Sequence, residues 1–191
     1  NKIKEKLNLP KNKKIIMYAP TWRDDEFIGK GNYKFSLKLD LDRLKKQLGD
    51  DYVIILRMHY LISSNLDISK FKEFAFDLSN YNDISELYLI SDILITDYSS
   101  VFFDYANLQR PILFYMYDIE KYRDQLRGFY LDLKELPGPI LKTTKDVIET
   151  ILNIDEVEGD YKKLYEEFYE RFCNWDDGKA SANVVKTVFD R

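Results

Sequence analysis

The chain has 191 residues, of which 45% are hydrophobic and 32% charged, and its net charge is -4. These are ordinary values for a globular domain that is large enough to bury its own core. The acidic balance argues against general binding to a nucleic-acid backbone, and a single cysteine, Cys173, excludes an intrachain disulfide and a cysteine cluster for a metal. No apolar run approaches the ~20 residues of a membrane span.

Strand-like and helix-like segments alternate along the chain, which is typical of a parallel sheet with helices on both faces. Continuous apolar runs predict buried parallel strands, and apolar residues at helical spacing predict helices. We expect strands at Lys14–Ala19, Tyr52–Leu56, Glu73–Leu78, Asp92–Thr96 and Pro111–Tyr115. We expect helices at Leu39–Leu48, from Asp83 onward with Glu86 as its capping-box partner, and at Ser99–Asn107, Thr143–Leu152, Tyr161–Phe172 and Lys179–Phe189.

The chain has no repeat, low-complexity stretch or internal linker. We therefore expect residues 1–191 to form one domain with Rossmann-like winding. Two long segments, Thr21–Phe35 and Lys121–Pro139, fit neither pattern. Loops of that length in a compact domain are usually functional or mobile.

The residues Thr96–Ser100 (TDYSS) stand directly between a predicted strand and a predicted helix. At that position a helix N-terminus and the hydroxyls of Ser99 and Ser100 suit a phosphate or pyrophosphate. Asp104 follows one helical turn later and could accept hydrogen bonds from a ribose. Neither a glycine fingerprint nor a P-loop is present. The structural alternative is that Ser99 is a simple helix cap and Asp104 a solvated acid.

Cations stand near two other predicted strand ends and in the second long segment. Arg57 and His59 follow the Tyr52–Leu56 strand with one residue between them, so they share one face of the strand end. There they could hold a phosphate and move a proton. The alternative for a lone histidine is a structural role. Arg23, after the first strand, and Arg127, beside a glycine, offer planar donors for phosphate oxygens. Adjacent acidic pairs lack metal-ligand spacing, so we expect neither a metal nor a cofactor.

Six motifs occur in a fixed order over nearly the whole chain. They are YAPTWR (18–23), RMH (57–59), TDYSSVFFD (96–104), RGFY (127–130), PGP (137–139) and DGKAS (177–181). Together they make the chain similar to the CDP-glycerol:poly(glycerophosphate) glycerophosphotransferases of wall teichoic acid synthesis. Because several motifs agree in order and spacing, the resemblance is more specific than any one of them.

The resemblance implies a GT-B architecture, in which two Rossmann-like halves face a cleft. This chain would be the C-terminal half that binds the nucleotide donor, residues 1–13 an interdomain linker, and the acceptor half would be absent. The family transfers glycerol phosphate from CDP-glycerol to a growing, lipid-linked polymer at the cytoplasmic face of the cell membrane, with release of CMP. Each half is thought to contribute one essential histidine. The fragment would therefore be soluble, peripheral to the membrane in its full context, and inactive alone.

The resemblance also implies roles for individual residues. His59 would be the acid/base or phosphate-binding group, and Ser99 and Ser100 would hold the donor phosphates. Asp104 would bind the ribose. Without a metal, the helix dipole and nearby cations would stabilise the leaving group. Contacts to phosphate or glycerol phosphate are assigned to Thr21, Arg23, Arg57 and Arg127.

Other functions stay open at this point. Within the same enzyme class, the chain could belong to a capsule or ribitol-phosphate polymerase, or to a nucleotide-sugar glycosyltransferase. From another class, it could be a non-catalytic flavodoxin-like binding or receiver module. A receiver should carry an acidic cluster after its first strand, where this chain has Pro-Thr-Trp-Arg. The related donors would be CDP-polyols, and nucleic acid is not an expected partner.

Overall fold

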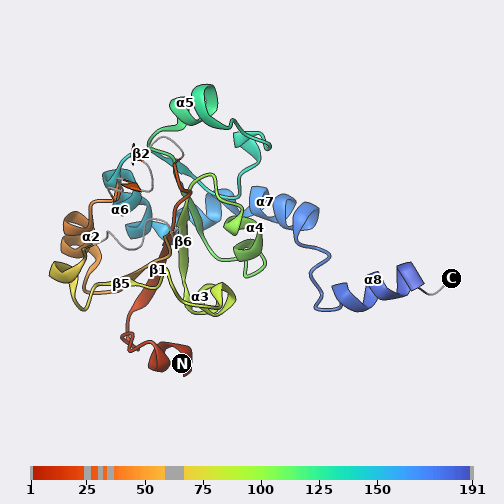
Figure 1. Ribbon diagram of the computed structural model, residues 1–191, viewed down its shortest axis with the longest axis horizontal. Helices are drawn as coiled ribbons and strands as arrows, with labels where there is room; N and C mark the ends of the chain where they lie inside the picture. The colour runs from red at the N-terminus through yellow and green to blue at the C-terminus, as the bar shows by residue number, and fades with distance from the viewer. Residues whose placement is uncertain (1, 24–26, 30–31, 34–36, 59–66, 190–191) are drawn as a thin grey trace.

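The computed structural model describes residues 2–23, 27–29, 32–33, 37–58 and 67–189. A parallel six-stranded sheet forms the centre, with the strand order β5-β4-β1-β6-β7-β8 (Figure 1). Its strands are β1 (Lys14–Ala19), β4 (Tyr52–Leu56), β5 (Ala75–Asp77), β6 (Ile93–Thr96), β7 (Ile112–Tyr115) and β8 (Ile140–Leu141). Numbered along the sheet strands alone, this is the order 3-2-1-4-5-6 of a doubly wound Rossmann fold, which confirms the predicted fold class.

Helices cover both faces of the sheet, so every central strand is apolar on both sides. Ile16 and Ile54 belong to the face that packs against α2 (Leu41–Leu48) and α6 (Thr144–Leu152). Met17 and Val53 point to the other face. That face packs against α3 (Ile84–Ile90), α4 (Val101–Ala106) and α7 (Ile154–Phe172). Burial on two faces is the reason why β1 and β4 read as unbroken apolar runs in the sequence.

Polar side chains begin the helices at the expected places. Asp83 caps α3 by accepting a hydrogen bond from the backbone N–H of Ser85 at 2.9 Å. Glu86 accepts from the hydroxyl of Tyr81 instead of closing the expected capping box, and it lies 3.4 Å from the amine of Lys6. Lys6 belongs to α1 (Lys2–Lys6), so these contacts dock the N-terminal segment on α3. That residues 1–13 form an interdomain linker stays a prediction.

Most expected elements are found within two residues of their predicted bounds, and the structure makes two larger corrections. Helix α7 begins at Ile154, well before the expected Tyr161, and strand β8 was not expected at all. Short elements lie within the two unassigned segments or overlap the start of the second. These are β2 (Phe27–Gly29), β3 (Asn32–Tyr33), α5 (Ile119–Lys121), the π-helix Tyr122–Leu126 and the 3-10 helix Leu133–Glu135. A further 3-10 helix covers Ser69–Phe71.

Gly138, in the PGP motif, lies where the chain passes directly against the start of β7. A Cβ atom at this position would stand 1.9 Å from the carbonyl oxygen of Ile112. No side chain fits into that space without moving the strand. The glycine of this motif is therefore required by the packing of the sheet.

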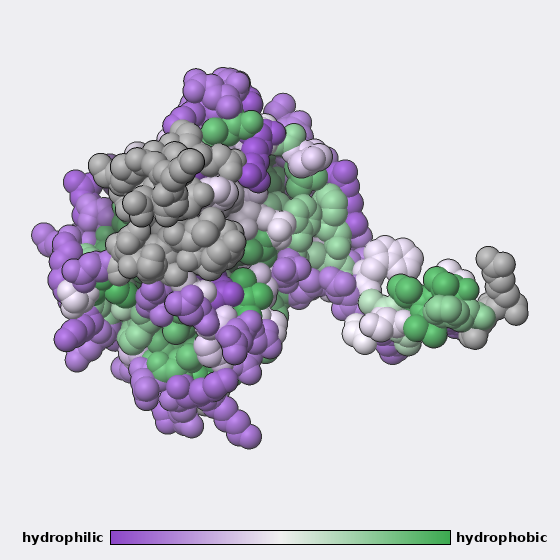
Figure 2. All heavy atoms as spheres, in the orientation of Figure 1, coloured by the Kyte–Doolittle hydropathy of each residue, from purple (hydrophilic) through white to green (hydrophobic). Residues whose placement is uncertain are grey.

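Helix α8 (Ala180–Phe189) projects away from the body of the domain (Figure 1). All of its residues are exposed, and its apolar side chains form the isolated green end in Figure 2. The largest of them, Phe189, is 76% exposed. None of the helices in the described ranges combines the length and apolar character needed to cross a lipid bilayer.

Removing residues 178–191 should change the free energy of unfolding by less than about 0.5 kcal/mol, because exposed residues contribute little to a core. Urea denaturation of the truncated and complete chains measures this difference. The comparison is Phe168→Ala on α7, where a side chain only 3% exposed is lost and the expected cost is about 3–5 kcal/mol. A truncation as damaging as Phe168→Ala would show that α8 supports the fold.

Candidate functional site

The chain leaves the centre of the sheet in two directions. From β1 it continues to β4 on one side, and from β6 to β7 on the other, so the connections diverge between the adjacent strands β1 and β6. Such a switch point leaves a crevice outside the carboxyl ends of the strands, where α/β proteins bind ligands. A cavity of about 740 Å³ lies here. It is lined by residues 19–22 at the end of β1 and after it, 57–58 after β4, 79 after β5, 84 in α3, 98–101 after β6, and 122 and 127 in the segment after β7.

Five residues predicted for the site line this one cavity. They are Thr21, Arg57, Ser99, Ser100 and Arg127. Their segments lie far apart in the sequence and meet because the strands are parallel. The structure therefore brings these five residues together, whereas the ligand that each residue binds stays a prediction.

The two serines begin α4 but contribute little to capping it. Ser100 occupies the N-cap position without a side-chain cap bond, and it is exposed. The hydroxyl of Ser99 accepts from the backbone N–H of Val101 only at 3.5 Å. A simple capping role, the structural alternative for Ser99, therefore accounts poorly for either hydroxyl.

Arg57 holds the loop between β5 and α3. Its Nη1 donates to the backbone carbonyls of Leu78 and Tyr81 at 3.0 and 2.8 Å, and to that of Ser79. The hydroxyl of Ser79 in turn accepts from the backbone N–H of Met58 at 2.9 Å. These bonds fix one wall of the cavity, so Arg57 has a structural role whether or not it also contacts a phosphate.

Arg23 is buried beside the cavity, between two carboxylates. Its Nη2 lies 2.9 Å from Oδ2 of Asp97, its Nε 2.8 Å from Oδ2 of Asp118, and its Nη1 donates to the carbonyl of Thr21 at 2.7 Å. Burial lowers the pKa of Arg23, but the hydrogen bond to Asp118 and the charge of Asp97 outweigh it, so the pKa lies above its usual value. Burial raises the pKa of Asp97, and the charge of Arg23 opposes that rise. Phosphate contact by Arg23 stays a prediction.

Aromatic rings surround this buried charge, which the sequence analysis did not anticipate. The ring of Tyr98 stacks on that of Tyr122, with centroids 3.6 Å apart, and Arg23 lies 4.9 Å above Tyr98. The hydroxyl of Tyr98 donates to Oδ1 of Asp118 at 3.0 Å. Burial, followed by the charge of Asp118, raises the pKa of Tyr98. Tyr98 belongs to the TDYSS motif, but nothing local in the sequence marks Asp118 as its partner.

Of the predicted residues that the structure describes, Arg23 and Asp104 are not among those that line the cavity. Asp104 is exposed on α4, and its charge helps to raise the pKa of Tyr88, after the larger effect of burial. Its assignment to a ribose stays a prediction. His59 falls outside the described residues. Arg57 and Met58, which precede it in the sequence, both line the cavity.

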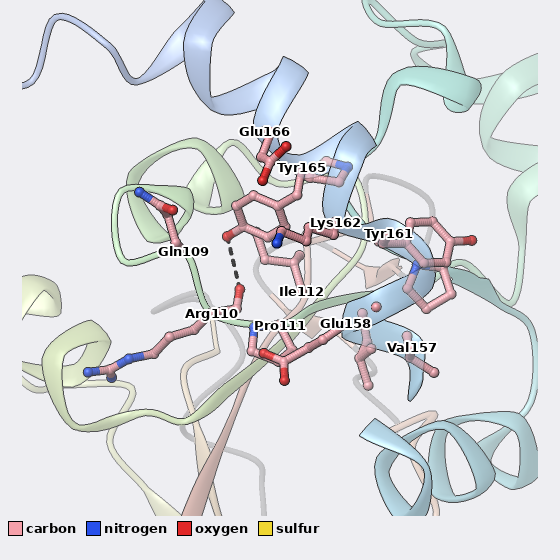
Figure 3. Close-up of a pocket in the computed structure, with 15 residues that line it drawn as sticks. Gln109, Arg110, Pro111, Ile112, Val157, Glu158, Tyr161, Lys162, Tyr165 and Glu166 are labelled. Carbon is pink, nitrogen blue, oxygen red and sulfur yellow. Dashed lines mark hydrogen bonds between the residues drawn. The ribbon is translucent and has the colours of Figure 1, made fainter. Parts of the chain in front are cut away.

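Another cavity, of about 300 Å³, lies at the amino ends of β7 and β8. Figure 3 shows the residues that line it. It is formed by residues 109–113 before and within β7, by the PGP motif, and by one side of α7. Its best-defined contact is the hydroxyl of Tyr165, which donates to the carbonyl of Arg110 at 2.9 Å. None of the predicted site residues lines it. In the part of the chain that the structure describes, no cluster of three or more His, Cys, Asp or Glu residues could hold a metal ion.

A doubly wound sheet with a cavity at its switch point, lined by hydroxyls and arginines, defines the class of Rossmann-like α/β domains. The chain belongs to the CDP-Glycerol:Poly(glycerophosphate) glycerophosphotransferase family, whose model matches residues 1–190. This membership selects the transferase over the receiver-module alternative.

The sequence relatives include teichoic acid polymerases of two kinds. The chain is 59% identical over 185 residues to the teichoic acid poly(glycerol phosphate) polymerase of Staphylococcus epidermidis, covering 96% of this chain and 26% of that one. It is 37% identical over 184 residues to the teichoic acid poly(ribitol-phosphate) polymerase of Bacillus spizizenii, covering 93% of this chain and 28% of that one. The chain thus spans about a quarter of the length of these relatives.

The solved structure of the wall teichoic acid polymerase TagF has the same fold. It matches with a TM-score of 0.89 and 56% identity, over 99% of this chain and 46% of that one. A variant of TagF soaked with CDPG matches with the same score. The similarity to this GT-B enzyme confirms the predicted fold class, that of one half of such an enzyme.

Tyr98→Phe should lower the free energy of unfolding by about 1.5–3 kcal/mol, because the largely buried carboxylate of Asp118 loses a hydrogen bond while the ring stack is kept. The matched control is Tyr130→Phe, since Tyr130 is fully exposed and should tolerate the same change without effect. Urea denaturation at neutral pH compares the two variants. Equal stability of both would mean that the bond between Tyr98 and Asp118 contributes nothing to the fold.

Proposed function

We propose that this chain is the donor-binding half of a transferase that moves glycerol phosphate from CDP-glycerol to a growing poly(glycerophosphate) chain in teichoic acid synthesis. The acceptor would enter from the other half of the GT-B pair. The observation that carries the proposal is the switch-point cavity, where Ser99, Ser100 and Arg127 meet in a member of the glycerophosphotransferase family. Its volume of about 740 Å³ falls within the usual range of small-molecule sites.

The donor diphosphate would lie between the start of α4 and Arg127. The hydroxyls of Ser99 and Ser100 can donate to phosphate oxygens, and the planar guanidinium of Arg127 can bridge two of them. Thr21 follows β1 in the sequence and lines the cavity, where it can contact the glycerol phosphate. Asp104 would reach the ribose from the exposed side of α4.

The reaction requires an acceptor hydroxyl to attack the phosphorus that carries the glycerol. As the new P–O bond forms, the bond to the CMP oxygen breaks and CMP leaves. His59 would accept the proton of the hydroxyl or hold the donor phosphate, and a histidine of the other half would take the remaining role. Arg127 would stabilise the negative charge that develops on the leaving phosphate.

The sequence relatives favour glycerol over ribitol as the polyol of the donor. The chain shares 59% identity with the glycerol phosphate polymerase and 37% with the ribitol phosphate polymerase. A CDP-ribitol donor is therefore the second candidate. The arginines and hydroxyls around the cavity suit the diphosphate that both donors share.

The complete protein would work at the cytoplasmic face of the membrane on a lipid-linked acceptor. We place the apolar side chains of α8, exposed in this chain, against the other half. The chain alone would bind the donor but would not polymerise, because acceptor groups and the second histidine would come from the other half.

Ser100→Ala should weaken the binding of CMP and CDP-glycerol to this chain by about fivefold, equivalent to about 1 kcal/mol for one lost hydrogen bond. Isothermal calorimetry on the folded chain measures the affinity. Ser181→Ala on the exposed helix α8 is the matched control and should bind like the unmodified chain. The same affinity in all three proteins would remove Ser100 from the site, and failure of the unmodified chain to bind would refute the donor-binding proposal.

In the full-length enzyme, His59→Ala should lower turnover by roughly 10²-fold or more, the range typical for loss of a general acid or base. Release of CMP from CDP-glycerol in the presence of acceptor provides the assay. The unfolding midpoint of the variant is the control, because a loss of activity through unfolding would return His59 to a structural role. Turnover at the unmodified rate would exclude His59 from the chemistry.

A further inference from the structure

Three strand ends are joined beneath the floor of the cavity by one buried charged cluster. It consists of Arg23, which follows β1, Asp97, which follows β6, and Asp118, which follows β7. Their side chains are 4%, 2% and 14% exposed, respectively. None of the three lines the cavity, but they can fix the backbone that does.

Asp97 connects this cluster to the cavity wall. Its Oδ1 accepts from the backbone N–H of Thr21 at 2.7 Å and from that of Tyr98 at 2.6 Å. Thr21 and Tyr98 line the cavity, and Ser99 follows Tyr98 directly. A shift of the Asp97 carboxylate would therefore move both sides of the crevice at the switch point.

The cluster depends on the shape of arginine. Three nitrogens of one planar group reach Asp97, Asp118 and the carbonyl of Thr21 in three directions. A lysine amine keeps the charge, but it is a single point that cannot span these oxygens. Two buried carboxylates share this single guanidinium in the cluster, so its loss would leave both negative charges without the cation that compensates them.

We propose that Arg23 is a positioning residue of the donor site, which holds Thr21 and the Tyr98–Ser100 segment in place without touching the donor. This inference rests on the proposed function only in naming the ligand. It replaces direct phosphate contact by Arg23 with an action through Asp97 and Asp118. We expect that a substitution of Arg23 disturbs the geometry of the cavity under conditions in which the domain is still folded.

The test compares Arg23→Lys with Arg43→Lys, an arginine-to-lysine change at an exposed position of α2. Amide hydrogen exchange without ligand follows residues 98–101, and calorimetry measures CMP affinity well below the unfolding midpoint. In Arg23→Lys we expect exchange at these amides to rise about tenfold or more, and CMP affinity to fall about tenfold. Arg43→Lys should match the unmodified chain in both.

Asp118→Asn provides a second variant if Arg23→Lys folds poorly. It keeps the shape of the side chain but removes the negative charge that pairs with the guanidinium of Arg23. Hydrogen exchange at residues 98–101 should rise and CMP affinity should fall, each to a smaller extent than in Arg23→Lys. Unchanged exchange and CMP affinity in a folded Arg23→Lys or Asp118→Asn protein, with only a lower unfolding midpoint, would overturn the inference. If the unmodified chain binds no CMP, the proposed function fails, whereas increased exchange at residues 98–101 would still support positioning.

Discussion

All six strands of the central sheet run in the same direction, so their carboxyl ends meet at one edge. A parallel sheet needs a crossover after every strand, and each crossover must begin at that edge. The residues that follow β1, β4, β5 and β6 therefore crowd together around the point where the strand order reverses. The cavity, the two serines of α4 and the buried charge beneath them all result from this arrangement.

The central strands could be predicted closely because their burial on two faces leaves a plain signal. The expected bounds of β1 and β4 coincide with those observed, since both are continuous apolar runs. Strand β8 gave no comparable signal because it contains only Ile140 and Leu141. The first part of α7, residues 155–160, is largely acidic and includes a glycine, so its helical form depends on its neighbours in the fold.

The candidate site shows the same division between local and long-range information. Ser99, Ser100 and Arg57 could be found from sequence because each stands at or just after a predicted strand end. The surroundings of Arg23 could not, because the guanidinium meets Asp97 and Asp118, which follow two other strands. The local sequence around an arginine that follows a strand is the same whether the side chain faces solvent, a ligand or two buried carboxylates.

The PGP motif illustrates that a motif shared within a family can reflect a requirement of the fold as well as a requirement of the chemistry. Gly138 stands at the edge of the sheet opposite the candidate site, where a Cβ would meet the carbonyl of Ile112. The steric limit there concerns the path of the backbone and is indifferent to the chemistry of any substrate. A change of ligand chemistry at the switch-point crevice would leave the constraint on this glycine as it is.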